Sequence, residues 1–248
     1  MNLYELFKTM CFNIRSLRLY WLNVLTTSLL IPLSYLIIVI LLSPDSPNHI
    51  IMALTGFIVI SEFSTLVLPV ALLVGGIFDE NVVELYASLP TGFSEIILSY
   101  VLTYLVFSIP VLFGFLLVIS KYTAMVNWPY LLIGLVYLLT LCSLIGIWLG
   151  LYIKNRLILE PLLSLMLIAV IVFTPAYYRL TNVSGPLRLI TLVNPVTHVV
   201  NLLRTGVNMC EGVETSFSIL YLTLIVMVIS ISIVLRLNRG LTNFLEVK

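Results

Sequence analysis

The sequence predicts an all-α polytopic membrane protein with six transmembrane helices, and three observations lead to this fold class. The chain of 248 residues is 61% hydrophobic and 9% charged, whereas an ordinary soluble domain is about 25% charged. Six apolar segments reach the roughly 20 residues that a helix needs to cross a bilayer. None of them alternates apolar and polar residues as the strands of a membrane β-barrel do. Because backbone groups in lipid must form hydrogen bonds within the protein, these segments are predicted to be helices.

The six predicted spans set the topology. They lie at residues 22–42, 51–78, 96–120, 128–153, 157–176 and 217–236. If both termini are cytoplasmic, eight of the twelve Lys and Arg residues fall on the inner side, which agrees with the positive-inside rule. We therefore expect one transmembrane domain over residues 1–248, in the cell membrane, with cytoplasmic N- and C-termini.

The first 21 residues are too polar to span a membrane but have the pattern of an amphipathic helix. Apolar side chains recur at steps of three or four residues, namely at Leu3, Leu6, Phe7, Met10, Ile14, Leu17 and Trp21. Charged residues fall between them, and the cations suit anionic lipid headgroups. This pattern predicts an interfacial helix on the inner leaflet; the alternative is a basic tail that only directs membrane insertion.

Residues 177–216 form the longest connector, and the expected topology places it outside the cell. Its two apolar stretches are separated by Asn194-Pro195. Asparagine is a good N-cap and proline a good first residue of a helix, while the residue before a proline is driven out of helical conformation. We expect a short helix, a break, and a second short helix beginning near Pro195, both lying in the outer leaflet or re-entering it.

The sequence contains none of the common catalytic or metal-binding motifs. It has no P-loop for ATP, no HExxH and no GxSxG, and its two histidines and three cysteines lie far apart in the chain. The net charge of +1 gives no indication of a nucleic-acid partner. We expect no catalysis, no metal site and no cofactor in this chain.

Glu62 is the one acidic residue that falls clearly inside a predicted span. It lies about eleven residues into the second span, so at about 1.5 Å per residue it is roughly 16 Å deep. A charged side chain near the middle of a bilayer costs about 2.5–3.5 kcal/mol or more. Two interpretations stay open: Glu62 lines a substrate or ion path, or it is a structural carboxyl bonded to a serine such as Ser61 or Ser64.

The connector at residues 79–95 holds four of the eleven acidic residues and is the largest cytoplasmic connector between two predicted spans. Glu80 and Glu84 are one turn apart on a short helix that Leu89-Pro90 ends, and Ser94 is placed to cap the next helix. An exposed acidic helix suits a basic groove on a cytoplasmic partner. The alternative is a solvated linker whose acidic residues only keep it in water.

This connector, with the sequence ENVVELYASLPTGFSEIILS, resembles the one between the second and third helices of ABC-2 type transporter permeases. That family has a glutamate, then G-x-x-E-x-L-x-x-x-P, a turn rich in Ser and Thr, and an acidic residue that opens the third helix. The matching positions are Glu80, Glu84, Ser88, Leu89, Pro90, Ser94 and Glu95. Two positions differ, because the glycine of the pattern is Asn81 here and a lysine often found in the third helix is Tyr100.

A second stretch, FTPAYYRLTNVSGPLRLITLVNPVTHVVNLLR, is similar to the external segment that follows the fifth helix in the same family. There a proline follows the helix, another proline begins a short helix, and an N-P-x-T/S step leads to an arginine. The matching residues are Pro175, Pro186, Asn194, Pro195, Thr197 and Arg204. With the N-terminal amphipathic helix and six spans, the resemblance covers essentially the whole chain.

The resemblance implies that the chain is a permease subunit of an ABC exporter. Two six-helix subunits, identical or paralogous, would enclose a path through the lipid bilayer, and each would dock a separate ATPase subunit that binds ATP and Mg²⁺. Docking would use the N-terminal helix and the connector residues Glu80, Glu84, Leu85, Tyr86, Ser88, Leu89 and Pro90. The apolar character of the spans favours a hydrophobic or amphipathic substrate.

Two other functions remain open at this point. The chain could be a secondary transporter that works alone and uses Glu62 as a proton or ion site. Such transporters often contain inverted repeats, but residues 22–120 and 128–236 show no convincing similarity to each other. The chain could also be a membrane scaffold of the same fold that transports nothing.

Overall fold

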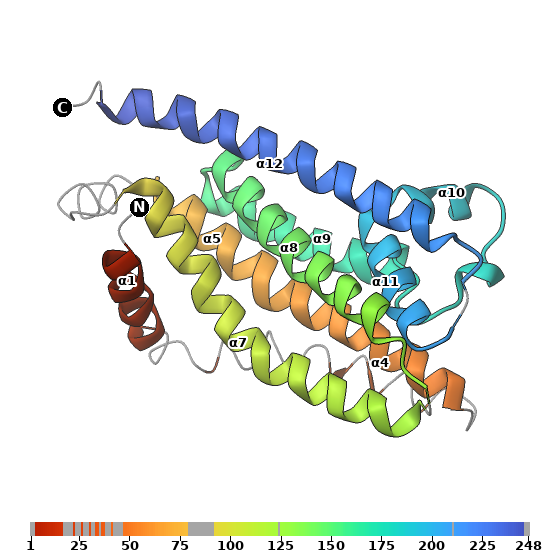
Figure 1. The fold of residues 1–248 in the computed structure, drawn as a ribbon. Helices are drawn as coiled ribbons and strands as arrows, with labels where there is room; N and C mark the ends of the chain where they lie inside the picture. The colour runs from red at the N-terminus through yellow and green to blue at the C-terminus, as the bar shows by residue number, and fades with distance from the viewer. Residues whose placement is uncertain are drawn as a thin grey trace.

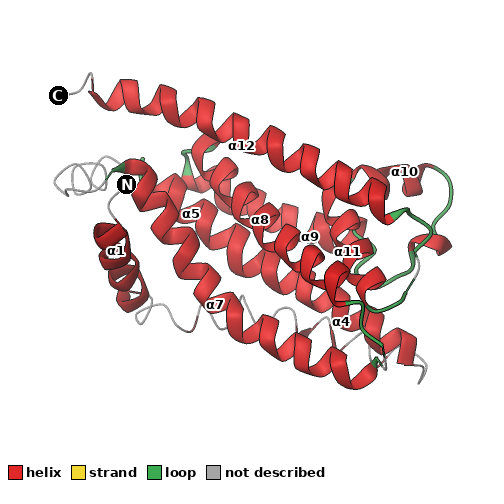
Figure 2. Cartoon of the chain, in the orientation of Figure 1, coloured by secondary structure: helices red, strands yellow, loops and turns green. Residues whose placement is uncertain are grey.

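The computed structural model describes residues 3–16, 47–78, 92–123, 125–209 and 211–245, together with a few isolated residues between 22 and 41. Every regular element in these residues is helical (Figure 2). The elements are α1 (Leu3–Ser16), α4 (Pro47–Glu62), the π-helix η3 (Phe63–Val67), α5 (Leu68–Gly76), α7 (Phe93–Tyr122), α8 (Trp128–Tyr152), α9 (Arg156–Phe173), the 3-10 helix η4 (Leu180–Asn182), α10 (Pro186–Val193), α11 (Pro195–Gly206) and α12 (Thr215–Leu245).

Five helical segments are long and apolar enough to cross a membrane, as expected of a multi-pass membrane protein. They are Asn48–Gly76, Phe93–Tyr122, Trp128–Tyr152, Arg156–Phe173 and Thr215–Leu237. These segments correspond to the second to sixth predicted spans. Most of the first predicted span, at residues 22–42, lies outside the described residues.

Local chemistry explains where the helices begin and end. Gly92, and not Ser94 as the sequence led us to expect, is the N-cap of α7. The Gly92 N–H donates to the carboxylate of Glu95 at 3.2 Å, so the acidic residue satisfies a donor that the helix leaves open. The fifth span ends at Phe173 rather than at residue 176, because the backbone is extended at Thr174, the residue before Pro175.

The segment α4–η3–α5 is the central helix of the bundle (Figure 1). In its most apolar window 72% of the residues are buried inside the protein, compared with 17% for α9 and for α12. The helix is continuous but changes to π geometry over Phe63–Val67. Pro69 lies two residues after the π-helix, and because proline has no N–H to donate to the carbonyl four residues earlier, it interrupts the regular α pattern there.

Glycines on α8 allow it to pack closely against this central helix. A Cβ atom on Gly150 would lie 2.6 Å from the Ala71 carbonyl oxygen, and one on Gly146 would lie 3.1 Å from the Val70 Cβ. Only a residue without a side chain permits such an approach. The Gly146-x-x-x-Gly150 pair therefore serves packing within the chain.

The bundle has two distinct ends (Figure 1). At one end lie α1, the end of α5, the beginning of α7 and the last part of α12; at the other lie α10 and α11. Helix α1 is attached to α7 by a hydrogen bond of 3.0 Å from Asn13 Nδ2 to Ser99 Oγ. Its buried side includes Leu6 and Asn13, whereas Phe7, which the sequence pattern placed on the same apolar face, is exposed.

Candidate functional site

The predicted partner-coupling residues lie outside the described residues. Glu80, Glu84, Leu85, Tyr86, Ser88, Leu89 and Pro90 all fall within residues 79–91. The structure does describe Phe78, directly before these residues, and Phe93, at the start of α7 after them. The geometry of these two flanks shows how the connector is attached to the bundle.

The flanks of the connector are held together at the α1 end. The rings of Phe78 and Phe93 meet edge to face with their centroids 5.7 Å apart. The Lys154 ammonium, in the turn between α8 and α9, lies 4.6 Å from the centroid of the Phe78 ring, which is a cation–π distance. The ends of α5 and α7 and the turn between α8 and α9 thus meet at this end of the bundle, so a displacement of the connector would reach the central helix.

The opposite end carries the helix, break and helix that the sequence predicted. Gly185 has a φ of 64°, a left-handed value that favours glycine, and Pro186 then begins α10. Asn194 is the N-cap of α11, and its Oδ1 accepts from Val196 N–H at 3.0 Å. The same side chain donates to Thr174 Oγ1 at 2.9 Å, which ties the break to the end of α9.

Arg204 on α11 is fully buried and organises the connections around it. Its Nη1 donates to Glu211 Oε1 at 2.7 Å and to the Tyr178 carbonyl at 3.0 Å. Its Nη2 donates to the Ala176 carbonyl at 2.9 Å, and its Nε donates to Thr55 Oγ1 on α4 at 3.3 Å. One guanidinium therefore joins the loop after α9, the loop after α11 and the central helix.

The charges of this pair are well compensated. Glu211 Oε2 accepts from the Leu180 N–H at 2.7 Å, so both of its oxygens are bonded. Burial lowers the pKa of the Arg204 guanidinium, and the Glu211 carboxylate opposes that shift. Gly56 makes the arrangement possible, because a Cβ atom there would lie within van der Waals overlap of the Ala176 carbonyl. The pattern identified Arg204, but nothing in the sequence pointed to Glu211 or Thr55 as its partners.

His198 was not among the predicted site residues, yet it lies at the junction of three helices. Its Nε2 is 2.9 Å from the Leu192 carbonyl on α10, and its Nδ1 is 3.1 Å from Ser218 Oγ on α12. Asn201, one turn further along α11, donates to the same Ser218 oxygen at 2.9 Å. Burial lowers the pKa of His198, although the Leu192 carbonyl opposes this shift. The sequence signal for this site was the spacing of three residues between His198 and Asn201, which places both side chains on one face of α11.

Glu62 is the last residue of α4 and lies directly before the π-helix. It is residue 15 of the 29 in its span, Asn48–Gly76, so it is close to the middle. Its exposed fraction is 0%. Neither carboxyl oxygen has a hydrogen-bond partner among the described residues, which contradicts the interpretation in which Ser64 bonds to it: the Ser64 hydroxyl donates back to the Ile60 carbonyl at 2.8 Å.

Two small side chains from neighbouring helices lie close to Glu62. Ser108 on α7 lies close to the carboxyl, but its hydroxyl donates to the Tyr104 carbonyl at 3.2 Å. Cys142 on α8 is within electrostatic reach of Glu62. Two buried hydroxyls, those of Thr65 and Ser143, also lack a hydrogen-bond partner in the described part of the chain. Unpaired polar groups are unusual in protein interiors and call for an explanation.

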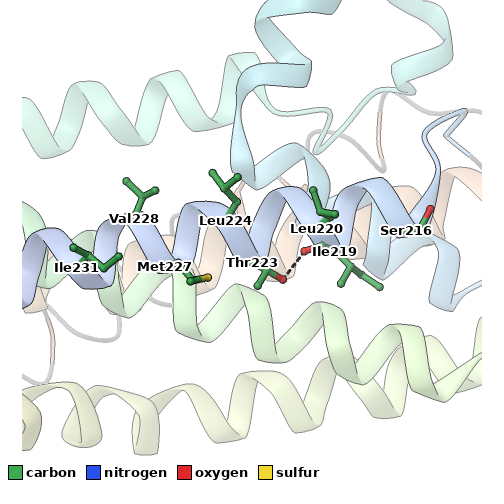
Figure 3. A pocket seen from close by; sticks show the side chains of 8 residues that line it. All are labelled: Ser216, Ile219, Leu220, Thr223, Leu224, Met227, Val228 and Ile231. Atoms are coloured by element: carbon green, nitrogen blue, oxygen red, sulfur yellow. Dashed lines mark hydrogen bonds between the residues drawn. The ribbon is translucent and has the colours of Figure 1, made fainter.

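A shallow hollow on the surface offers little for recognition. It is lined by Ser216, Ile219, Leu220, Thr223, Leu224, Met227, Val228 and Ile231. Figure 3 shows that all eight side chains come from α12, where the Thr223 hydroxyl donates to the Ile219 carbonyl at 2.7 Å. An apolar face on one helix of a membrane bundle is what lipid contact requires.

Two comparisons with known proteins found no match to this chain. No protein-family model matches the sequence, and a search of curated proteins finds no significant relative.

Proposed function

We propose that the chain is the membrane-spanning permease subunit of an ABC exporter, driven by a separate ATPase subunit. The observation that carries this proposal is the construction of the α1 end. The flanks of the acidic connector, Phe78 and Phe93, meet there under Lys154. An ATPase bound to α1 and to the connector would act at once on the ends of α5 and α7 and on the turn between α8 and α9.

The opposite end supports the same function. Arg204 fastens the α10–α11 segment to the central helix through Thr55, and α5 at the other end of that helix leads into the connector. The central helix thus links the proposed docking site to the α10–α11 segment. Movement of the connector would be transmitted to the far end of the bundle, as a path with alternating access requires.

The remaining features of the proposal follow from the resemblance. The chain would pair with a second permease subunit, identical or paralogous, and ATP and Mg²⁺ would bind to the ATPase partner. The substrate would be hydrophobic or amphipathic and would leave the cell. The membrane would be the cell membrane, with both termini in the cytoplasm, so the α1 end would face inward.

Co-purification tests this function. The tagged chain is extracted in mild detergent, and the bound proteins are identified by mass spectrometry. We expect a P-loop ATPase with the wild type and its loss in the double variant Glu84→Arg, Leu89→Glu. Glu214→Arg is the matched control, because Glu214 is exposed near the α10–α11 end and its replacement should leave the ATPase bound. Absence of any ATPase from folded wild-type chain contradicts the proposal.

The buried Glu62 supports a second candidate, a secondary transporter that works without an ATPase. Its carboxyl is buried near the middle of its span without a hydrogen-bond partner among the described residues, and ionisable groups inside membranes commonly mark proton or ion pathways. Transport that persists when ATP hydrolysis is abolished, but stops when the proton gradient is collapsed, would favour this candidate. A scaffold that transports nothing would instead show no stimulation of ATP hydrolysis by any substrate.

A further inference from the structure

The Glu62 carboxyl has no cation to neutralise it in the part of the chain that the structure describes. No salt bridge joins Glu62 to a described Lys or Arg. The buried cation Arg204 contacts the same helix, but it bonds to Thr55. Thr55 is seven residues before Glu62, or about 10 Å away along the helix axis. Its guanidinium is already paired with Glu211.

Hydrogen bonds give a negative charge there little support, because Ser108, the one described donor close to the carboxyl, already donates to the Tyr104 carbonyl. The Ser64 hydroxyl also donates to a backbone carbonyl, and neither carboxyl oxygen accepts a hydrogen bond from a described residue. An ionised carboxylate without a cation and without donors is strongly disfavoured at this depth in a membrane. The simplest group that removes the charge is a proton on the carboxyl itself.

We propose that Glu62 is a proton-binding site inside the membrane, protonated while α4, α7 and α8 are packed around it and able to release its proton when these helices separate. The π-helix Phe63–Val67 begins at the next residue, and π-turns inside α-helices are common at functional positions. Pro69 and the π-turn leave this part of the central helix less regular than the rest, so it is the place where the packing can change most easily. The site does not depend on the proposed ATPase partner.

The other titratable groups on the packed helices do not compete for this role. The buried ones are Tyr100 and Tyr104 on α7, Cys142 on α8, and His198 and Arg204 on α11. The others are exposed or half-buried: His49 on α4, Glu95, Lys121 and Tyr122 on α7, Tyr130, Tyr137 and Tyr152 on α8, and Glu160 on α9. Among them Cys142 is the group within electrostatic reach of Glu62. A thiol is neutral at physiological pH unless a cation lies beside it, so the surroundings of Glu62 are uncharged.

Infrared spectroscopy of the purified chain in lipid tests the site directly. A protonated carboxyl has a carbonyl band above the amide bands, and an ionised one does not. At neutral pH we expect this band in the wild type, its loss in Glu62→Gln, and its retention in Glu160→Gln, whose exposed carboxylate is paired with Arg156. Absence of the band from the wild type overturns the proposal, as does its disappearance when sodium replaces choline at constant pH, which would identify a cation site.

A labelling experiment on the wild type guards against a variant that does not fold. Dicyclohexylcarbodiimide is apolar and reacts with protonated carboxyls, and mass spectrometry locates the adduct. We expect an adduct on Glu62 at neutral pH and none on Glu160. Reaction of Glu62 only in acid, together with a missing infrared band, would show an ordinary ionised carboxylate.

Protein stability gives a third readout. A carboxyl that is neutral in the folded chain and ionised in the unfolded chain makes folding less favourable as pH rises from about 5 towards neutrality. Burial of His198 acts in the opposite direction, because it lowers the pKa of that imidazole in the wild type and in Glu62→Gln alike. The readout is therefore the difference between the two proteins: the melting temperature of the wild type relative to that of Glu62→Gln should fall as pH rises through this range. A difference that does not change with pH overturns the proposal. Binding of the ATPase is unaffected in either case, so the two proposals fail independently.

Discussion

Two buried ionisable residues, Arg204 and Glu62, have opposite environments in this protein. Arg204 bonds to four oxygen atoms, including a carboxylate of Glu211. Glu62 has no described partner for either oxygen. A fully paired charge holds a structure in one arrangement, while an unpaired one is costly and persists where it serves another purpose. We therefore assign Arg204 to architecture and Glu62 to proton binding.

The Arg204–Glu211 pair should be essential for stability. Glu211→Gln removes the charge that compensates a fully buried guanidinium, and breaking a buried pair costs about 3–5 kcal/mol. We expect a large drop in the melting temperature of the detergent-solubilised chain. Glu160→Gln is the matched control, because the Arg156–Glu160 pair is exposed and is worth less than about 1 kcal/mol. Equal melting temperatures for the two variants would contradict the assigned role.

At the scale of elements, the close contact between α8 and the central helix depends on glycines. The distances at Gly146 and Gly150 show that no side chain fits between these helices. Helices in a membrane attract one another mainly through such close packing and polar contacts, since lipid is as apolar as the side chains. The position of α8, and with it the surroundings of Glu62, therefore depends on small residues.

Gly150→Ala should destabilise the chain, and Gly114→Ala should not. The added Cβ at position 150 would lie 2.6 Å from the Ala71 carbonyl oxygen and 2.7 Å from the Val74 Cβ, and such overpacking typically costs about 1–3 kcal/mol. At Gly114 on α7 the added atom would meet nothing within 4 Å, so the better helix propensity of alanine should leave stability unchanged or raise it by up to about 1 kcal/mol. Thermal unfolding measures both, and a neutral Gly150→Ala would argue against the close packing.

At the scale of the whole molecule, the two ends of the bundle should face opposite sides of the membrane. Lys8 on α1 and Glu214 before α12 are both exposed and lie at opposite ends. The positive-inside rule predicts that the α1 end faces the cytoplasm. This sidedness underlies the proposed docking of an ATPase.

Single cysteines test the sidedness. In a chain whose native cysteines are replaced, Glu214→Cys should react with a membrane-impermeant maleimide in intact cells. Lys8→Cys should react only after the cells are permeabilised. The reverse pattern would invert the orientation and remove the basis for a cytoplasmic docking site, and labelling of both positions from one side would contradict the fold.

The sequence by itself determined the helical class and the approximate limits of five of the membrane-spanning helices. It also determined the break at Asn194-Pro195, because length, hydropathy and capping are local properties of a chain in lipid. The tertiary structure alone decided which residues meet. Glu211 and Thr55 became partners of Arg204, His198 joined three helices, and Glu62 was left without the serine partner that its neighbours had suggested. Such contacts depend on how helices rotate and pack against one another, and the apolar pattern of a membrane helix carries little information about its rotation, since lipid and core prefer the same side chains.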